Sequence, residues 1–209
     1  MLNALLRLLL PVLTSRTARA IFRLSPKGLF GWRYATLLAE VQAQLHTTKH
    51  TLPTPLDGDD QVVVNWYTQD SFDPDLNYQT LNHVLRGAAH ARTAQLLALA
   101  AYLIEALGKL PPHQFWTYRV VHSHPTIRSE YSPGSVVTER GFVSSSRNPR
   151  NPLPGQAYFT LIGKTGRFIG FLSHFLLEDE VLFAPQTTFK ILAADDLADG
   201  TSHFIMKEL

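Results

Sequence analysis

The sequence contains no cysteine in its 209 residues. Disulfide bonds, cysteine-ligated zinc and a cysteine nucleophile are therefore excluded. The compartment stays open, because a reducing cytosol and an exported chain that must unfold would both tolerate this absence. Charged residues are scarce at 17%, and hydrophobic residues make up 45%, which excludes disorder over the whole chain. The length allows one domain with a sizeable core, or a domain plus an appendage.

Long hydrophobic runs are also absent. The apolar stretch Leu2–Leu13 is interrupted by Asn3, Arg7 and Pro11, and it is too short for a transmembrane helix. Three interpretations of residues 1–30 remain open. We favour a helix that is part of the fold, and a basic helix docking on a membrane or a partner comes second. A signal peptide is the third, because Ala18-Arg19-Ala20 fits a small-x-small cleavage site.

The charge is unevenly distributed along the chain. Residues 1–49 contain seven Lys/Arg and a single acid, which leaves 12 basic and 16 acidic groups in the remaining 160 residues. The segment Thr51–Asp60 is rich in Pro, Asp and Gly and predicts a loop. We therefore expect a basic helical arm over residues 1–55 and a mildly acidic main domain over residues 56–209.

Hydrophobic periodicity predicts helices first and strands afterwards, which indicates the α+β class. We expect helices over 34–45, 76–86 and 91–107, and a short strand at 62–64. We expect further strands over 115–121, 141–145, 157–163, 167–171, 180–183, 188–193 and 203–207.

Two motifs suggest chemistry that their context does not support. Gly163-Lys164-Thr165 is similar to the end of a phosphate-binding loop, but residue 158 is Tyr where that pattern requires Gly. Because the segment lies between two predicted strands, we expect a tight hairpin turn. His122-x-His124 has no third ligand at zinc-like spacing, so we expect solvated histidines and no metal site.

Three other segments, taken in their order along the chain, point to the same function. They are Tyr118-Arg119 within a predicted strand, the serines Ser144-Ser145-Ser146, and the acidic turn Glu178-Asp179-Glu180 that opens a further strand. In this order they resemble the mono-ADP-ribosyltransferases of the Arg–Ser–Glu class, in the arginine-specific Glu-x-Glu form found in bacterial effectors and toxins. Two residues depart from the family pattern. Val120 follows the arginine where the family often has Gly, and the middle serine replaces Thr.

The resemblance implies an architecture and a substrate. It implies N-terminal helices packed on two central, mainly antiparallel sheets with an NAD cleft. NAD is then the substrate, and no metal is required.

The resemblance also implies a role for each motif residue. Glu180 would stabilise the oxocarbenium-like transition state at the ribose, and Ser144 would orient that carboxylate. Arg119 would bind the pyrophosphate, with Ser146 in the same cofactor-binding set. Glu178 would polarise the acceptor guanidinium. On an extended segment its side chain would point the same way as that of Glu180, and the two carboxylates would raise each other's pKa.

Two neighbouring segments carry further expectations. By the same resemblance, the segment before Glu178 contacts the target protein, so Phe175 and Leu176 are either an exposed docking patch or packed under the sheet. The loop 147–154 is either a plain surface loop or a cover over the cofactor, with Arg147 or Arg150 on a phosphate.

We expect a transferase that moves ADP-ribose from NAD to a protein arginine. The alternatives are NAD glycohydrolysis, a non-arginine or nucleic-acid acceptor, and an inactive binding module of the same fold. The family implies a secreted or injected toxin acting in the cytosol of a host or competitor cell. A cognate immunity protein is expected if the competitor is a bacterium.

Overall fold

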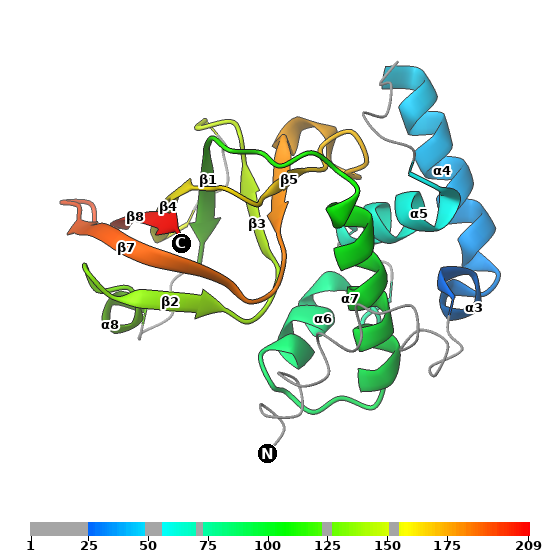
Figure 1. Cartoon of the computed structure of the whole chain (residues 1–209), viewed down its shortest axis with the longest axis horizontal. Coiled ribbons are helices and arrows are strands. Elements are labelled where there is room, and N and C mark those ends of the chain that lie inside the picture. The colour runs from blue at the N-terminus through cyan, green and yellow to red at the C-terminus, as the bar shows by residue number, and fades with distance from the viewer. Residues whose placement is uncertain (1–24, 49–55, 70–72, 123–126, 151–154) are drawn as a thin grey trace. The chain divides into compact units, whose positions relative to one another are not determined.

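The computed structural model describes residues 25–48, 56–69, 73–122, 127–150 and 155–209 (Figure 1). The chain divides into two compact units. The helical unit comprises the residues up to Pro111 together with Phe171–Leu176, and the sheet unit comprises Pro112–Gly170 and Leu177–Leu209. Helices precede strands, as the sequence predicts. The expectations for residues 1–24, for 51–55 in the loop and for His124 lie outside the described residues.

Five helices form the described part of the helical unit. They are α3 (Pro26–Phe30), α4 (Arg33–Thr48), α5 (Gly58–Tyr67), α6 (Tyr78–Leu85) and α7 (Thr93–Gly108). In α7, Leu96, Leu99 and Leu103 recur at helical spacing and are fully buried. The predicted helices over 34–45, 76–86 and 91–107 are therefore confirmed.

The short strand expected at residues 62–64 is wrong, because these valines lie inside α5. A capping box begins this helix. The amide of Asp60 donates to the Asp57 carboxylate, and the amide of Asp57 donates to the Asp60 carboxylate, each at 2.9 Å. All three valines are fully buried, so packing of the helix overrides the β-preference of branched residues.

Helices α3 and α4 pack against α5. The Phe30 and Trp66 rings lie 5.7 Å apart, and the Tyr34 hydroxyl donates to Asp59 at 2.6 Å. The division at residues 55/56 expected from the charge distribution therefore falls inside the helical unit, whereas the compact units divide after Pro111.

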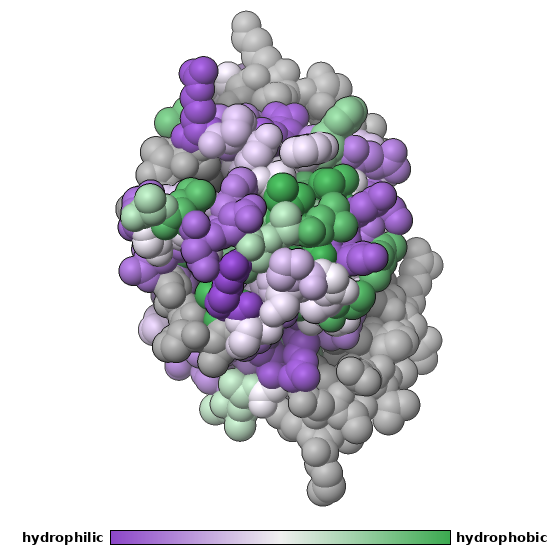
Figure 2. All heavy atoms as spheres, turned by 90° about the vertical axis from the view of Figure 1, so that its left-hand side faces the viewer, coloured by the Kyte–Doolittle hydropathy of each residue, from purple (hydrophilic) through white to green (hydrophobic). Residues whose placement is uncertain are grey.

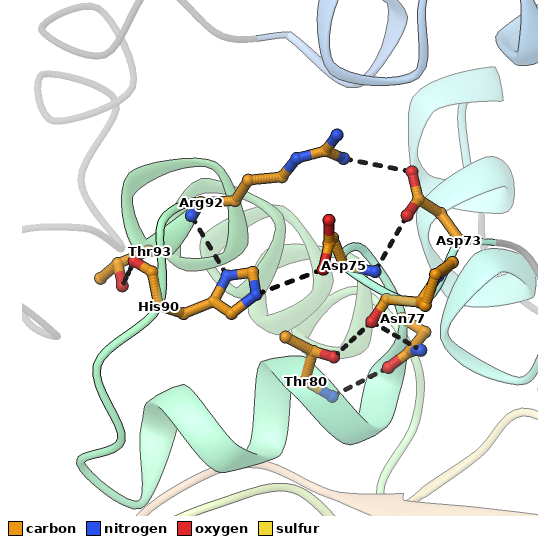
Figure 3. Close-up of polar contacts among 8 residues, drawn as sticks. Asp73, Asp75, Asn77, Thr80, His90, Arg92 and Thr93 are labelled. Carbon is orange, nitrogen blue, oxygen red and sulfur yellow. Dashed lines mark hydrogen bonds and ion pairs between the residues drawn. The ribbon is translucent and has the colours of Figure 1, made fainter.

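A polar network joins the loop before α6 to the loop before α7 (Figure 3). Arg92 pairs with Asp73 at 3.1 Å, and His90 lies 3.6 Å from Asp75. The backbone amide of Arg92 donates to His90 Nδ1, which leaves Nε2 facing Asp75. Asn77 caps α6 by accepting from the Thr80 amide at 2.8 Å. The two loops are thereby cross-linked through side chains.

From Pro112 onward, the described residues form eight strands, a short helix and a 3₁₀ turn. They are β1 (Trp116–Val121), α8 (Ile127–Glu130), β2 (Val136–Glu139), β3 (Val143–Ser146), β4 (Ala157–Ile162), β5 (Arg167–Phe168), η1 (Leu176–Glu178), β6 (Glu180–Phe183), β7 (Thr187–Asp196) and β8 (Ser202–Glu208). Each expected strand of the sheet unit has a counterpart, but the strand expected over 167–171 ends at Phe168, and β2 and α8 are additions to the prediction.

The eight described strands form one sheet in the order β2-β7-β8-β4-β1-β3-β6-β5. Every pair is antiparallel except β4 with β8. The expected two sheets are thus one continuous hydrogen-bonded sheet, while the α+β class is confirmed. Phe159 and Phe204 stack at 4.8 Å in its core, and Tyr131 packs edge-on against Phe159. The order places β1, β3 and β6 side by side.

The hairpin expected at Gly163-Lys164-Thr165 is wrong, because β4 and β5 are not neighbours in the sheet. The segment is a connection that Glu208 holds from β8. The Glu208 carboxylate accepts from the amides of Lys164 and Thr165 and from the Thr165 hydroxyl. The loop donors that would bind a phosphate in a phosphate-binding loop therefore bind the Glu208 carboxylate of the same chain.

Figure 2 looks onto the side where β2, β7 and β8 lie in Figure 1, and apolar side chains gather there among polar ones. Val136 and Leu192 are exposed on these strands. A register shift between Ile191 and Ala193 makes Leu192 the extra residue of a bulge, which turns its side chain outward. No helix within the described ranges is long and apolar enough to cross a membrane.

Candidate active site

Arg119 lies on β1, the strand between β4 and β3. Its backbone pairs with Phe159 of β4, while its side chain reaches the other neighbour. There the Nη1 atom donates to the carbonyl oxygen of Ser144 at 2.7 Å. That bond uses a single donor of a guanidinium that carries five. A central strand therefore holds the arginine against the serine motif.

The three serines of β3 have three different partners. The Ser144 hydroxyl donates to Glu180 Oε1 at 2.7 Å, and the Ser145 hydroxyl donates to the carbonyl of Val181 at 3.0 Å. The Ser146 hydroxyl accepts from the amide of Asn148 at 2.9 Å and is buried. Only Ser144 thus binds a carboxylate, while Ser146 closes the turn that follows the strand.

Glu180 opens β6 opposite Ser146 and is only 5% exposed. Its carbonyl accepts from the Ile169 amide at 2.9 Å, so the backbone is fixed on both sides. Arg119, Ser144 and Glu180 consequently form a chain of hydrogen bonds across three neighbouring strands. A buried carboxylate held by a charge-assisted bond is a preorganised negative charge.

Glu178 lies elsewhere than an extended segment would place it. It ends the 3₁₀ turn η1, and Asp179 then adopts φ 48°, in the left-handed region. Asp visits this region more readily than most residues. The expectation that Glu178 and Glu180 project the same way along a strand is wrong, because the strand begins only at Glu180. Glu178 is half-buried, in contrast to the buried Glu180.

The segment before Glu178 presents apolar side chains to solvent. Phe175 is 37% exposed, Leu176 44% and Leu177 94%. The backbone of this segment is anchored within the helical unit, where Asn65 donates to the Leu172 carbonyl at 2.9 Å. Of the two alternatives for Phe175 and Leu176, exposure to solvent is therefore the one found in the structure, and packing under the sheet is not.

Two polar pairs near the site have no signal in the sequence. Arg147 pairs with Asp179 at 2.9 Å across 32 residues. The Tyr131 hydroxyl donates to Glu139, and burial, followed by the Glu139 charge, strongly raises the pKa of Tyr131. The positive charge of Arg119 partly opposes that rise, which places Tyr131 within its electrostatic reach.

The described residues contain no set of side chains arranged to bind a metal ion. His122 is exposed, and no group of three His, Cys, Asp or Glu residues there is arranged to hold a metal ion. At Ser144 the structure brings together a guanidinium, a hydroxyl and a carboxylate. These groups can bind a phosphate, orient an acid and stabilise a cation.

Comparison with known proteins places these strands in a family. Residues 31–209 match the model of a family described as NAD:arginine ADP-ribosyltransferase. The NAD(+)–protein-arginine ADP-ribosyltransferase Tre1 of Serratia proteamaculans (strain 568) is 32% identical over 132 residues, which is 63% of this chain and 29% of Tre1. The chain therefore matches less than a third of that relative's length.

Solved structures share the fold at low sequence identity. The type III effector XopAI from Xanthomonas axonopodis pv. citri aligns with a TM-score of 0.74 and 19% identity, over 100% of this chain and 92% of XopAI. Exoenzyme S from Pseudomonas aeruginosa, solved with human 14-3-3 protein beta and Carba-NAD, aligns with a TM-score of 0.67 and 16% identity, over 90% and 88%. The ADP-ribosyltransferase-like fold is confirmed. Because the family model matches residues 31–209, most of the sequence, the chain belongs to the NAD:arginine ADP-ribosyltransferase family.

Proposed function

We propose that this chain transfers ADP-ribose from NAD to an arginine side chain of a target protein and releases nicotinamide. The observation that carries the proposal is the chain of hydrogen bonds from Arg119 through Ser144 to the buried carboxylate of Glu180. The Arg119 guanidinium bonds the main-chain carbonyl of Ser144, and the Ser144 hydroxyl bonds the Glu180 carboxylate, so one residue of β3 holds both charged side chains. A guanidinium suits a phosphate, and a carboxylate suits a developing cation.

In the cleavage step, the bond between C1′ of the ribose and the nicotinamide nitrogen breaks. The electron pair of that bond goes to the pyridinium ring, which leaves as neutral nicotinamide. Positive charge develops on the ribose, as in glycoside hydrolysis, and the Glu180 carboxylate stabilises it. Ser144 keeps the carboxylate in place, and Arg119 binds the pyrophosphate with its planar fork. The Ser146 hydroxyl holds the turn at the end of β3 by accepting from the Asn148 amide, and we assign it to the cofactor-binding set as a residue that shapes this turn.

In the transfer step, a guanidinium nitrogen of the acceptor forms a bond to C1′. Its proton passes to a carboxylate, and we assign that role to Glu178. A guanidinium is a poor nucleophile unless a base polarises it, because it stays protonated at physiological pH. Glu178 is more exposed than Glu180, which suits contact with an incoming macromolecule.

The test is Glu180→Gln, which keeps the shape and removes the charge. Incubation with labelled NAD and a cell lysate, followed by mass spectrometry, identifies the modified residue. We expect transfer and nicotinamide release to fall together by about a hundredfold or more. Near wild-type turnover would refute the site. Nicotinamide release that no target accelerates, with no modified residue in the lysate, would favour NAD glycohydrolysis, and modification of a nucleic acid would replace the protein acceptor.

The setting proposed is that of a bacterial toxin or effector. The chain would be secreted or injected and would modify its target in the cytosol of a host or competitor cell. A cognate immunity protein is expected in the second case, and the basic N-terminal arm offers a surface for a membrane or a partner. Family membership and the net charge of the arm support this setting. Growth arrest on cytosolic expression, abolished by Glu180→Gln, is the expected result.

A further inference from the structure

The turn between the two glutamates is held from outside by one arginine. Arg147 follows β3 directly, and its backbone amide donates to the carbonyl oxygen of Asp179 at 3.0 Å. Its guanidinium donates from Nη2 to Asp179 Oδ1 at 2.9 Å. A single residue therefore grips both the main chain and the side chain of the residue that separates Glu178 from Glu180.

The guanidinium of Arg147 lies on an aromatic ring, which serves as a platform for it. Its central carbon lies 3.5 Å from the centroid of the Phe168 ring, in cation–π geometry. Phe168 lies on β5 and pairs with Val181 of β6, one residue beyond Glu180. A Cβ at Gly170 would approach the Phe168 ring to 2.7 Å and the Glu180 amide to 3.3 Å, so Gly170 lets the ring lie close to the turn. The platform is thus tied to the same strand as the catalytic carboxylate.

The backbone conformation explains why such a grip is useful. Asp179 has φ 48°, which an L-residue adopts at a cost unless its surroundings hold it. Glu180 is fixed independently by the sheet and by Ser144. Glu178 lies on the far side of the left-handed residue, and its place relative to Glu180 depends on the turn.

We propose that Arg147, Phe168 and Asp179 form a clamp that positions Glu178 for the acceptor arginine, and that Arg147 does not bind the cofactor. The proposal rests on the proposed transferase function. Loss of the clamp should lower transfer more than NAD cleavage, because cleavage uses Glu180. Loss should leave KM for NAD nearly unchanged, whereas an arginine on a cofactor phosphate would raise KM.

The experiment compares Arg147→Gln, Asp179→Asn and the double variant in the full chain. The matched control is Arg128→Gln, because Arg128 also pairs with a carboxylate, Asp196 at 3.4 Å, and lies 5.9 Å from the Phe204 ring. Both variants remove one positive charge from a half-exposed pair, and such pairs contribute little to global stability. Melting temperatures of all variants should therefore stay within a few degrees of wild type.

We expect Arg147→Gln and Asp179→Asn to lower kcat for transfer to an arginine analogue by about tenfold, because near-attack geometry tolerates little displacement. Nicotinamide release without acceptor should change by less than about threefold. The double variant should be no worse than Arg147→Gln, because the two residues act as one unit. A raised KM for NAD, equal losses in both assays, additive losses, or behaviour like Arg128→Gln would each overturn the clamp.

Hydrogen exchange provides a readout that needs no activity. Peptides covering residues 177–183 should exchange faster in Arg147→Gln than in Arg128→Gln, because the turn loses its contacts with the guanidinium and keeps only the main-chain bond. Unchanged exchange would overturn the clamp even if the wild-type chain proved inactive on NAD. Inactivity of the wild type with faster exchange in Arg147→Gln would instead refute the proposed function and keep the clamp.

Discussion

Removal of the Ser144 hydroxyl should separate catalysis from stability. In Ser144→Ala, the buried Glu180 carboxylate loses a donor at 2.7 Å, and little volume changes. A hydrogen bond to a charged group contributes about 1.5–3 kcal/mol. If that whole contribution acts in the transition state, kcat/KM for nicotinamide release should fall by about 10- to 150-fold.

The matched control lies one residue along β3. The Ser145 hydroxyl is also buried, but its partner is the backbone carbonyl of Val181 at 3.0 Å rather than a carboxylate. Ser145→Ala should lose about 1 kcal/mol of stability, which lowers the melting temperature by about 2–4 °C in a chain of this size. Ser144→Ala loses a bond to a charged group, so its melting temperature should fall further, by about 3–12 °C.

The assay is nicotinamide release at saturating and limiting NAD, with melting temperatures measured on the same preparations. We expect a large fall in kcat/KM for Ser144→Ala and a change of less than about twofold for Ser145→Ala. Equal rates in the two variants would refute the assignment of Ser144 as the residue that orients Glu180. An equally large loss in Ser145→Ala would mean that the geometry of β3, and not one hydroxyl, controls the rate.

The sequence predicts the positions of most elements because local patterns determine them. Helix α7 follows from apolar periodicity, and the strands of the sheet unit follow from short β-branched and aromatic runs. The three consecutive valines at residues 62–64 favour a strand when the sequence alone is considered. The pair Asp57 and Asp60 in front of them was the available signal for a capped helix start, with Asp in place of the usual Glu or Gln.

Local sequence patterns do not predict which distant strands pair. The connection from β4 to β5 looks like a hairpin because glycines flank a short polar segment. In the structure β5 pairs with β6, and Glu208 from the end of the chain occupies the turn. The parallel pairing of β4 with β8 likewise joins segments separated by about 40 residues. Such contacts depend on the whole sheet, so spacing alone does not reveal them.

In the candidate site, too, the sequence predicts some features and misses those that depend on distant contacts. Motif order predicts that Arg119, Ser144 and Glu180 act together, and the structure brings them into one hydrogen-bonded chain on adjacent strands. The orientation of Glu178 could not be predicted, because one left-handed residue redirects the chain without changing the sequence spacing. The sequence leaves Arg147 in a surface or cofactor-covering loop, because spacing does not reveal that its partner is Asp179, 32 residues away.

Three further variants test the division of labour in the sheet unit. Glu178→Gln should abolish transfer to an arginine analogue and keep a substantial part of nicotinamide release, and equal losses would assign Glu178 to the cleavage step or to the fold. Arg119→Lys keeps the charge but loses the fork, so calorimetry should show weaker NAD binding with little change in melting temperature; unchanged affinity would remove Arg119 from the site. His113→Gln tests a pH effect, since burial, followed by the charge of Arg147, lowers the pKa of His113. A lowered pKa means that the unfolded state binds more protons below about pH 6.5, so the free energy of unfolding should fall as pH decreases from 7.5 to 5.5. Urea unfolding at the two pH values should show a smaller fall for His113→Gln than for wild type, because the variant has no imidazole to protonate on unfolding. An identical fall in both proteins would mean that His113 is protonated equally in the folded and unfolded states, which would contradict its burial beside Arg147.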